Sequence, residues 1–188
     1  MVNKALFLDR DGVINYDYGY VHSIEDFVFV EGIFDLVIQA VQHSYEIFVV
    51  TNQAGIGRGY YTESQFQLLS DWMCGKFLSK GVEIRKVYYC PNHPVFGVGA
   101  YKRVDSRRKP GPGMFADAAS EFQLTMAESI LIGDKMSDIE AGLIAGVGTN
   151  ILLNFNDIER KSNCQRFDVV SSLHQAKKYI DKSGSSVI

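Results

Sequence analysis

Short apolar runs alternate with longer amphipathic stretches along the chain. The runs at residues 4–8, 46–50 and 149–153 are bounded by polar residues, which is typical of buried strands. Residues 32–43 carry apolar side chains at helical spacing, and Thr62 followed by Gln65 has the form of a capping box. The full pattern predicts strands at 4–8, 46–50, 82–89, 129–132 and 149–153, helices at 32–43, 62–81, 113–122 and 138–145, and a short strand with a helix within 167–180.

The alternation of strands and helices indicates the fold class. Successive βαβ units build a mainly parallel sheet that is covered by helices on both faces. We therefore predict an α/β, three-layer, Rossmann-like fold with a mainly parallel central sheet. Ligands in such folds bind outside the carboxyl ends of the strands, so those ends are where functional residues are expected.

Composition narrows the class of protein further. A chain of 188 residues fits one domain, and a net charge of -3 argues against a general nucleic-acid binder. No apolar run approaches the length of about 18 residues needed to span a membrane. Cys74, Cys90 and Cys164 are odd in number and far apart, which favours reduced thiols and a cytoplasmic protein. We take a monomer as the default, with residues 1–182 as the single domain and 183–188 as a C-terminal tail.

Acidic residues follow two of the predicted strands. Asp9 and Asp11 come directly after the first strand, and Asp134 and Asp138 follow the fourth. Asp-x-Asp-Gly alone is equally well explained by an ordinary turn. Two acidic strand ends in one parallel sheet favour a shared purpose, since a hard cation such as Mg2+ would relieve the repulsion between the carboxylates. Asp can also act as a nucleophile toward phosphorus.

The other strand ends carry groups that suit phosphoryl transfer. Thr51 and Asn52 can donate hydrogen bonds, and Lys109 provides a point charge for a phosphate. Arg108 offers a planar fork for a more distant anionic or hydroxyl group. A basic run such as 107–109 is usually a solvated loop, but the Pro and Gly residues that follow it at 110–113 indicate a defined conformation.

Four motifs resemble those of the haloacid dehalogenase superfamily, in order and over almost the whole chain. They are Asp9-Arg-Asp11-Gly, Thr51-Asn52-Gln53, Arg108-Lys109-Pro110 and Gly133-Asp134-Lys135-x-x-Asp138. Longer stretches narrow the resemblance to the D-glycero-D-manno-heptose 1,7-bisphosphate phosphatases, whose nearest relatives are the histidinol-phosphate phosphatases. These stretches are Asp17-Tyr-Gly-Tyr20-Val, Thr51 through Arg58-Gly, Tyr88-Tyr-Cys-Pro and Arg108 through Gly113.

The resemblance implies an activity and a role for each matched residue. The expected reaction is Mg2+-dependent removal of the C7 phosphate from the heptose bisphosphate, through an aspartyl-phosphate, in ADP- or GDP-heptose biosynthesis for lipopolysaccharide or capsule. Asp9 is the expected nucleophile, Asp11 the acid and base, and Thr51 and Lys109 the groups that stabilise the transferring phosphoryl group. The expected metal ligands are Asp9, Asp134 and the backbone carbonyl of Asp11. The expected substrate contacts are Asp17, Tyr18, Gly19, Tyr20, Asn52, Gln53, Ala54, Arg58, Arg108 and Lys135, and the loops alone shape the pocket because there is no separate cap domain.

The chain departs from this family at one loop. The family usually carries a structural zinc site, with Cys-x-His followed by Cys-x-Cys just before Arg-Lys-Pro. Here Cys90 is kept, but Asn92, Asp105 and Arg107 stand at the other three positions. Zinc normally takes four N or S ligands in such sites, so we expect structural zinc to be absent.

Three alternatives remain at this point. A histidinol-phosphate phosphatase, or another small sugar-phosphate phosphatase, would share the chemistry, but Arg58 and Arg108 favour an anionic sugar over a cationic amine. A receiver domain also uses strand-end aspartates and Mg2+, but it needs no second Asp for turnover, and the chain is long for one. A non-catalytic sugar-phosphate binder would not need the complete acidic set.

Overall fold

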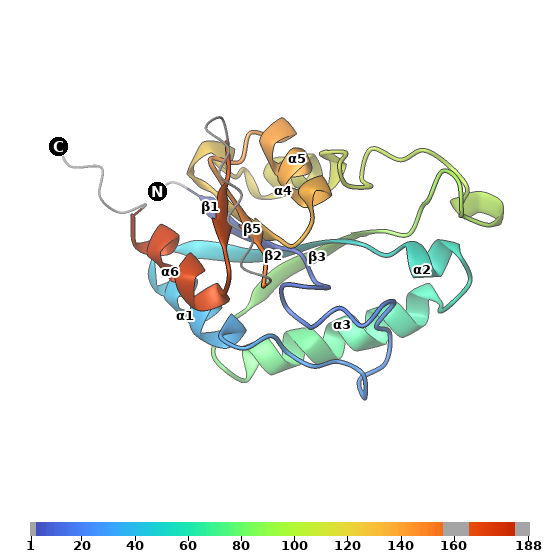
Figure 1. The fold of residues 1–188 in the computed structure, drawn as a ribbon, viewed down its shortest axis with the longest axis horizontal. Helices are drawn as coiled ribbons and strands as arrows, with labels where there is room; N and C mark the ends of the chain where they lie inside the picture. Colours follow the sequence, from blue (N-terminus) through green and yellow to red (C-terminus); the bar gives the residue numbers. More distant parts are fainter. Residues whose placement is uncertain (1–2, 156–165, 183–188) are drawn as a thin grey trace.

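A six-stranded parallel sheet forms the centre of the protein in the computed structural model, which describes residues 3–155 and 166–182 (Figure 1). The strand order is β3-β2-β1-β4-β5-β6, and every neighbouring pair is parallel. The strands are β1 (Lys4–Leu8), β2 (Tyr45–Asn52), β3 (Ile84–Cys90), β4 (Ile130–Gly133), β5 (Thr149–Leu153) and β6 (Asp168–Val170). The helices are α1 (Ile33–Gln42), α2 (Ala54–Gly57), α3 (Glu63–Leu78), α4 (Gly113–Phe122), α5 (Met136–Ile144) and α6 (Leu173–Lys182), with single 3-10 turns at Gly99–Tyr101 and Met126–Glu128.

The two faces of the sheet are covered by different helices. Leu6 and Leu8 of β1 belong to the apolar cluster that includes α1, α3 and α6. Ala5 and Phe7 point to the opposite cluster, where Phe115 of α4 packs edge-on against Phe7 with ring centroids 5.1 Å apart. Figure 1 shows α4 and α5 on one side of the sheet and α1, α3 and α6 on the other. The predicted three-layer α/β fold is confirmed.

Most predicted elements lie where the pattern placed them, with differences at their ends. Helix α5 begins at Met136, two residues before its predicted start, because the Asp138 carboxylate accepts from the Lys135 backbone N–H at 2.9 Å and satisfies the first turn. Helix α2 was not predicted, since a single turn is too short to show a periodic pattern. The predicted tail at 183–188 lies outside the described residues. Among the residues that the structure describes, no helix is long and apolar enough to cross a membrane.

The order of the strands in the sheet changes direction at β1, next to the candidate site. β1 lies between β2 and β4, so chain connections leave it in both directions. The carboxyl ends of all six strands meet at one edge because the sheet is parallel. Asp9 follows β1 and Asp134 follows β4, which brings them to the crevice where parallel α/β folds bind ligands.

Candidate active site

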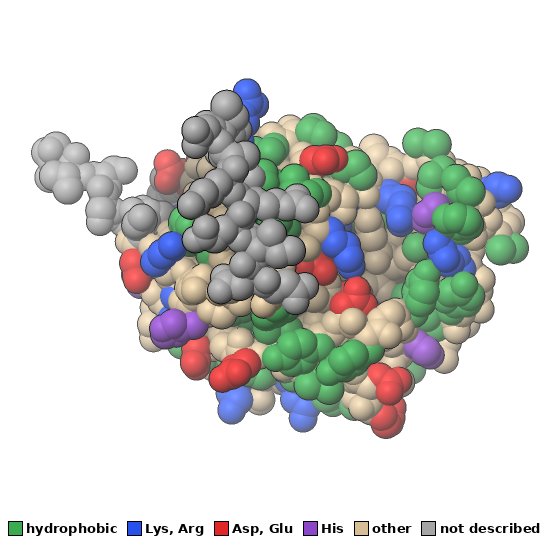
Figure 2. All heavy atoms as spheres, viewed as in Figure 1, with side chains coloured by type: hydrophobic (Ala, Val, Ile, Leu, Met, Phe, Trp, Pro, Cys, Tyr) green, Lys and Arg blue, Asp and Glu red, His purple; other side chains and the backbone are tan. Residues whose placement is uncertain are grey.

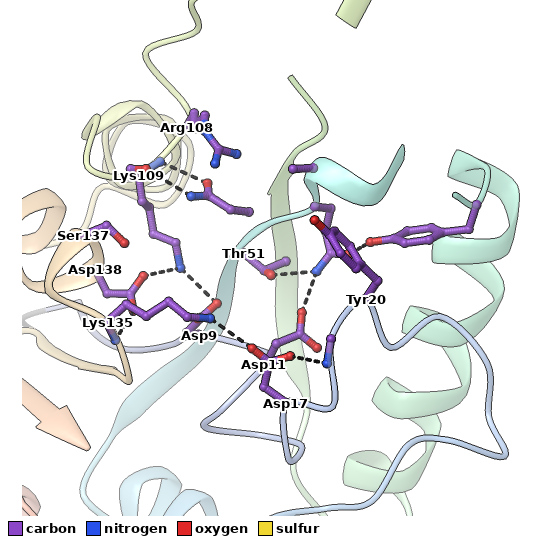
Figure 3. A pocket seen from close by; sticks show the side chains of 15 residues that line it. Asp9, Asp11, Asp17, Tyr20, Thr51, Arg108, Lys109, Lys135, Ser137 and Asp138 are labelled. Carbon is purple, nitrogen blue, oxygen red and sulfur yellow. Dashed lines mark hydrogen bonds and ion pairs between the residues drawn. The ribbon is translucent and has the colours of Figure 1, made fainter. Parts of the chain in front are cut away.

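A cavity of about 440 Å3 opens at the carboxyl edge of the sheet. Acidic and basic side chains meet near the middle of the face shown in Figure 2, and Figure 3 shows the side chains that line the cavity. Most of the predicted site residues lie in this lining: Asp9, Asp11, Asp17, Gly19, Tyr20, Thr51, Asn52, Gln53, Ala54, Arg108, Lys109 and Lys135. Tyr61, Ser137 and Asp138 line it as well.

Lys109 joins the two acidic strand ends at the floor of this cavity. Its side chain is almost completely buried, and Nζ lies 2.9 Å from Asp9 Oδ1 and 2.7 Å from Asp138 Oδ1. Nζ also donates to the Val50 carbonyl at 2.7 Å. Burial alone would lower the pKa of Lys109, but the Asp9 and Asp138 charges raise it, so the ammonium is kept. A buried cation is therefore fixed beside the predicted nucleophile.

Three carboxylates converge at the same point. One oxygen from each of Asp9, Asp134 and Asp138 lies within 4.8 Å of the others. Burial raises the pKa of Asp9 to about 8; the Lys109 charge opposes this rise, and Asp138, Asp134 and Asp11 add to it. Burial also raises the pKa of Asp134. Buried, mutually repelling carboxylates of this kind are stabilised in their charged forms by a divalent cation.

Asp11 is oriented by a buried guanidinium. Arg10 Nη2 donates to Asp11 Oδ1 at 2.8 Å and to Oδ2 at 2.9 Å, and the same nitrogen donates to the Val21 carbonyl at 2.7 Å. Asn15 donates a further hydrogen bond to Asp11 Oδ1 at 3.0 Å. These contacts hold the Asp11 carboxylate in a single orientation at the cavity wall.

Gln53 connects Asp11 to the end of β2. Its amide nitrogen donates to Asp11 Oδ2 at 3.0 Å and to Thr51 Oγ1 at 2.8 Å, while Tyr61 donates to its carbonyl oxygen. The side chain is 1% exposed. Its polar atoms position Thr51 and Asp11. Its predicted contact with substrate stays a prediction.

Asn52 has a comparable structural task. Its side-chain amide donates to the Lys109 carbonyl and accepts from the Lys109 N–H, both at 3.0 Å. This pair of hydrogen bonds ties the basic loop to the end of β2. Its predicted contact with substrate stays a prediction.

The segment that follows β1 forms one wall of the cavity. Asp17 Oδ1 accepts from the Gly19 N–H at 2.9 Å, and Asp17 Oδ2 lies 3.1 Å from Lys135 Nζ. The latter contact links the wall to the start of α5. Tyr20 adopts a left-handed backbone conformation, with φ 57°, and lines the cavity.

Three predicted site residues lie outside the main cavity. Tyr18 and Asp134 line an adjoining cavity of about 330 Å3. Arg58 is not among the lining residues; its guanidinium lies 4.4 Å from the ring centroid of Phe96 and 5.7 Å from that of Tyr20. Burial lowers the pKa of Arg108, and the Arg58 charge adds to this effect.

Arg10, Tyr61 and Ser137 were missed by the sequence analysis. A charged residue next to a strand usually reaches solvent, so nothing in the pattern indicated that Arg10 is 1% exposed. Tyr61 reaches the site only through the turn made by α2. Their contribution follows from tertiary packing, which the local pattern does not contain.

Comparison with known proteins decides the family. A HAD-hydrolase-like family model matches residues 106–176. The chain is 57% identical over 161 residues to the D-glycero-alpha-D-manno-heptose-1,7-bisphosphate 7-phosphatase of Burkholderia mallei, covering 85% of both chains. It is 47% identical to the D-glycero-beta-D-manno-heptose-1,7-bisphosphate 7-phosphatase of Vibrio cholerae, covering 81% of this chain and 82% of that one. The chain belongs to the heptose-1,7-bisphosphate 7-phosphatase family, within the HAD-like hydrolases.

A solved structure of a heptose 1,7-bisphosphate phosphatase has a similar fold. The crystal structure of D,D-heptose 1,7-bisphosphate phosphatase from B. bronchiseptica, complexed with magnesium and phosphate, aligns with a TM-score of 0.81. The alignment covers 95% of this chain and 98% of that one at 24% sequence identity. The likeness to this heptose-bisphosphatase supports the same α/β fold.

The carboxylate cluster fits the magnesium that the heptose-bisphosphatase fold implies. Asp134 Oδ1 is buried and has no hydrogen-bond partner among the described residues. An oxygen in that condition is costly unless something binds it, and Mg2+ prefers oxygen ligands. Asp9 lies beside it, and Gly12 keeps the space open, because a Cβ at Gly12 would lie 2.3 Å from Asp134 Oδ2.

Proposed function

We propose that this protein is a Mg2+-dependent phosphatase that removes the C7 phosphate from D-glycero-D-manno-heptose 1,7-bisphosphate. Membership of the family supports this assignment. The observation that carries it is the meeting of Asp9, Asp11 and Lys109 in one cavity, with Asp9 Oδ1 2.9 Å from Lys109 Nζ. These are a nucleophile, an acid and base, and a fixed positive charge, which are the parts that phosphoryl transfer needs.

The first step would transfer the phosphoryl group to Asp9. An Asp9 carboxylate oxygen attacks phosphorus, and the bond between phosphorus and the C7 oxygen breaks. Asp11 donates its proton to the leaving alkoxide, so the sugar departs as an alcohol. Lys109 and the Thr51 hydroxyl offset the negative charge on the phosphoryl oxygens.

The second step would release inorganic phosphate. Asp11, now a carboxylate, takes a proton from a water molecule that attacks phosphorus of the aspartyl-phosphate. The bond between phosphorus and the Asp9 oxygen breaks, and the Asp9 carboxylate is restored. The hydrogen bonds from Arg10 and Gln53 hold Asp11 in place through both steps.

Asp9, Asp134 and the carbonyl of Asp11 would hold the Mg2+. When bound, the ion supplies charge neutralisation for the phosphate and the surrounding carboxylates. Asp138 is already engaged with Lys109 and the Lys135 N–H, so we assign it to positioning rather than to the metal.

The distal end of the substrate would meet the basic wall. Arg108 lines the cavity, and the Arg58 guanidinium lies 5.7 Å from the ring centroid of Tyr20, which lines it as well. Guanidiniums at the cavity and near its lining would attract a second phosphate and repel a cationic amine, which favours a bisphosphate over histidinol phosphate. We also propose that the protein is a monomer and that it is cytoplasmic. The reducing cytoplasm suits the free thiols of Cys74 and Cys90.

Phosphate release with Mg2+ from both anomers of the bisphosphate and from histidinol phosphate tests the assignment. We expect kcat/KM to be higher for the bisphosphates than for histidinol phosphate. A higher kcat/KM for histidinol phosphate would refute the substrate assignment. Asp9→Asn should abolish turnover, because an amide is a poor nucleophile. Appreciable residual turnover in that variant would refute the covalent route.

A further inference from the structure

The loop between β3 and Lys109 holds the four positions at which the family usually binds structural zinc. They are Cys90, Asn92, Asp105 and Arg107 in this chain. An amide and a guanidinium are not zinc ligands of structural sites, so only Cys90 and Asp105 offer a suitable atom. Among the described residues, the one group of His, Cys, Asp and Glu that could hold a metal is the active-site cluster. The loop residues therefore do not fit the metal.

The same positions are bonded to one another instead. Asn92 Nδ2 donates to Asp105 Oδ2 at 2.6 Å, and Asp105 Oδ1 accepts from the Arg107 N–H at 2.8 Å. Asn92 is 2% exposed, so its end of this bond is shielded from water, and Asp105 is partly buried. The Arg107 guanidinium turns away from the group and binds Asp117 of α4 at 2.7 Å. We name this arrangement the Asn92–Asp105 clasp.

The contacts of the clasp stabilise the Asp105 carboxylate in its charged form. Partial burial opposes ionisation, but the hydrogen bonds from the Arg107 N–H and the Asn92 amide, together with the Arg103 and Arg107 charges, lower its pKa. The bonds to Asp105 are thus charge-assisted, which makes them stronger than bonds between neutral groups. His93, the nearest alternative metal ligand, uses Nδ1 to accept from the Val95 and Phe96 N–H groups at 3.2 and 3.0 Å.

The clasp is connected directly to Arg108 at the cavity. The Arg108 N–H donates to the Asp105 carbonyl at 3.0 Å, and its guanidinium Nη1 lies 3.4 Å from the Asn92 carbonyl. Both partners of the clasp therefore contact Arg108 through their backbone. Figure 3 shows Arg108 above the cavity, on the side away from Asp11.

The remainder of the loop is fastened at separate points. The Val98 N–H donates to the Gly57 carbonyl at 2.8 Å, and the Tyr101 hydroxyl donates to Glu63 Oε1 at 2.7 Å. These contacts join the outer part of the loop to α2 and α3. The segment just before Lys109 is placed by the clasp together with the Arg107–Asp117 ion pair and the Asn52–Lys109 hydrogen bonds.

We propose that the Asn92–Asp105 clasp takes the place of the family's structural metal and positions Arg108 to receive the distal end of the substrate. The role of Arg108 in receiving the substrate rests on the proposed function. Asn92 and Asp105 act through Arg108 and are positioning residues. The protein should therefore keep its loop ordered without zinc.

Substitution of the clasp should separate substrate affinity from chemistry. In Asp105→Ala and Asn92→Ala we expect KM for the heptose bisphosphate to rise by about ten-fold, the effect of losing one charge-assisted hydrogen bond. The kcat for p-nitrophenyl phosphate, which has no distal group, should stay within about two-fold. Asp105→Asn keeps an acceptor oxygen and should give an intermediate KM. Arg103→Ala is the matched control, because its exposed guanidinium lies 3.8 Å from Asp105.

Measurement of the zinc content tests whether the clasp takes the place of the structural metal. Wild-type protein purified with zinc in the medium should hold no stoichiometric zinc by elemental analysis. The triple variant Asn92→His, Asp105→Cys, Arg107→Cys restores four N and S ligands with Cys90 and should bind one zinc per chain. Stoichiometric zinc in the wild type, or a folded triple variant that binds none, would overturn the inference.

Amide hydrogen exchange keeps this inference separate from the substrate assignment. Asp105→Ala should speed exchange within residues 92–108 whatever the substrate is. If the wild type fails to hydrolyse the bisphosphate, the proposed function fails while exchange and zinc content still decide on the clasp. Unchanged exchange in this segment together with unchanged KM would refute the clasp itself.

Discussion

Arg10 Nη2 contacts both carboxylate oxygens of Asp11, at 2.8 and 2.9 Å, although the two residues are adjacent in sequence. Adjacent residues after a strand would normally point in different directions. The Arg10 side chain turns back into the protein, where it also binds the Val21 carbonyl and lies over the Phe66 ring. The acid and base of the proposed reaction is thus positioned from within the core.

Replacing Arg10 should impair proton transfer more than binding. In Arg10→Lys a positive charge is kept but the two-oxygen contact is lost, so we expect kcat for the heptose bisphosphate to fall by about ten-fold. The fall should be smaller for p-nitrophenyl phosphate, whose leaving group needs less protonation. Steady-state kinetics with both substrates measures this, and equal losses on both would contradict the role. Asp11→Asn is the reference variant, with an expected loss of about 100-fold or more on the bisphosphate.

Magnesium should stabilise the folded protein through Asp134. A ligand at about 100 times its Kd adds about 2.7 kcal/mol to the free energy of unfolding, which raises Tm. Asp134→Asn should remove most of this rise, because the unpartnered buried oxygen is where the ion would bind. Asp71→Asn, on the surface of α3, should keep it. A full Mg2+-dependent shift in Asp134→Asn, measured by thermal unfolding, would place the ion elsewhere.

Gly12 should tolerate no side chain. Its φ is +96°, and a Cβ there would lie 2.3 Å from Asp134 Oδ2, so Gly12→Ala adds a clash to backbone strain. We expect a loss of about 2 kcal/mol or more in unfolding free energy and a weaker Mg2+-dependent rise in Tm. Gly81→Ala has a similar φ of +79° in open space, so it should cost only the backbone term of about 1 kcal/mol. Urea unfolding of both variants gives the difference, and equal losses would exclude the clash.

Arg108 should matter more than Arg58 for the second phosphate. Arg108 lines the cavity, whereas Arg58 is not among the lining residues and packs against Phe96. Arg108→Ala should raise KM for the bisphosphate by about ten-fold to 100-fold, and Arg58→Ala by less. The kcat for p-nitrophenyl phosphate should change little in either variant. A larger effect of Arg58→Ala would place the distal phosphate at Arg58 instead.

The strand ends were accessible to sequence reasoning because they combine two local signals. An apolar run predicts a strand, and a polar residue at its end predicts a ligand contact once the sheet is parallel. Asp9, Thr51 and Asp134 were found in this way, and the structure brings them to one edge of the sheet. Asp138, the second acidic residue after the predicted fourth strand, also lies there and contacts Lys109.

The partners of these residues were beyond the reach of the sequence pattern. Gln53 was predicted to contact the substrate, and its bonds to Thr51 and Asp11 were not predicted. The pairing of Asn92 with Asp105 spans the whole loop, and neither residue carries a periodic signal. Such contacts depend on how loops close over the sheet, which local propensity does not determine.

The central place of β1 has a consequence for how the protein is made. Its strand is synthesised first, but both of its neighbours in the sheet, β2 and β4, leave the ribosome later. The nascent chain therefore carries Asp9 long before Lys109 and Asp134 exist to surround it. In a released fragment that ends before β4, the proposed nucleophile Asp9 would lack its carboxylate partner Asp134, so we expect activity only after the chain has been translated beyond Asp138.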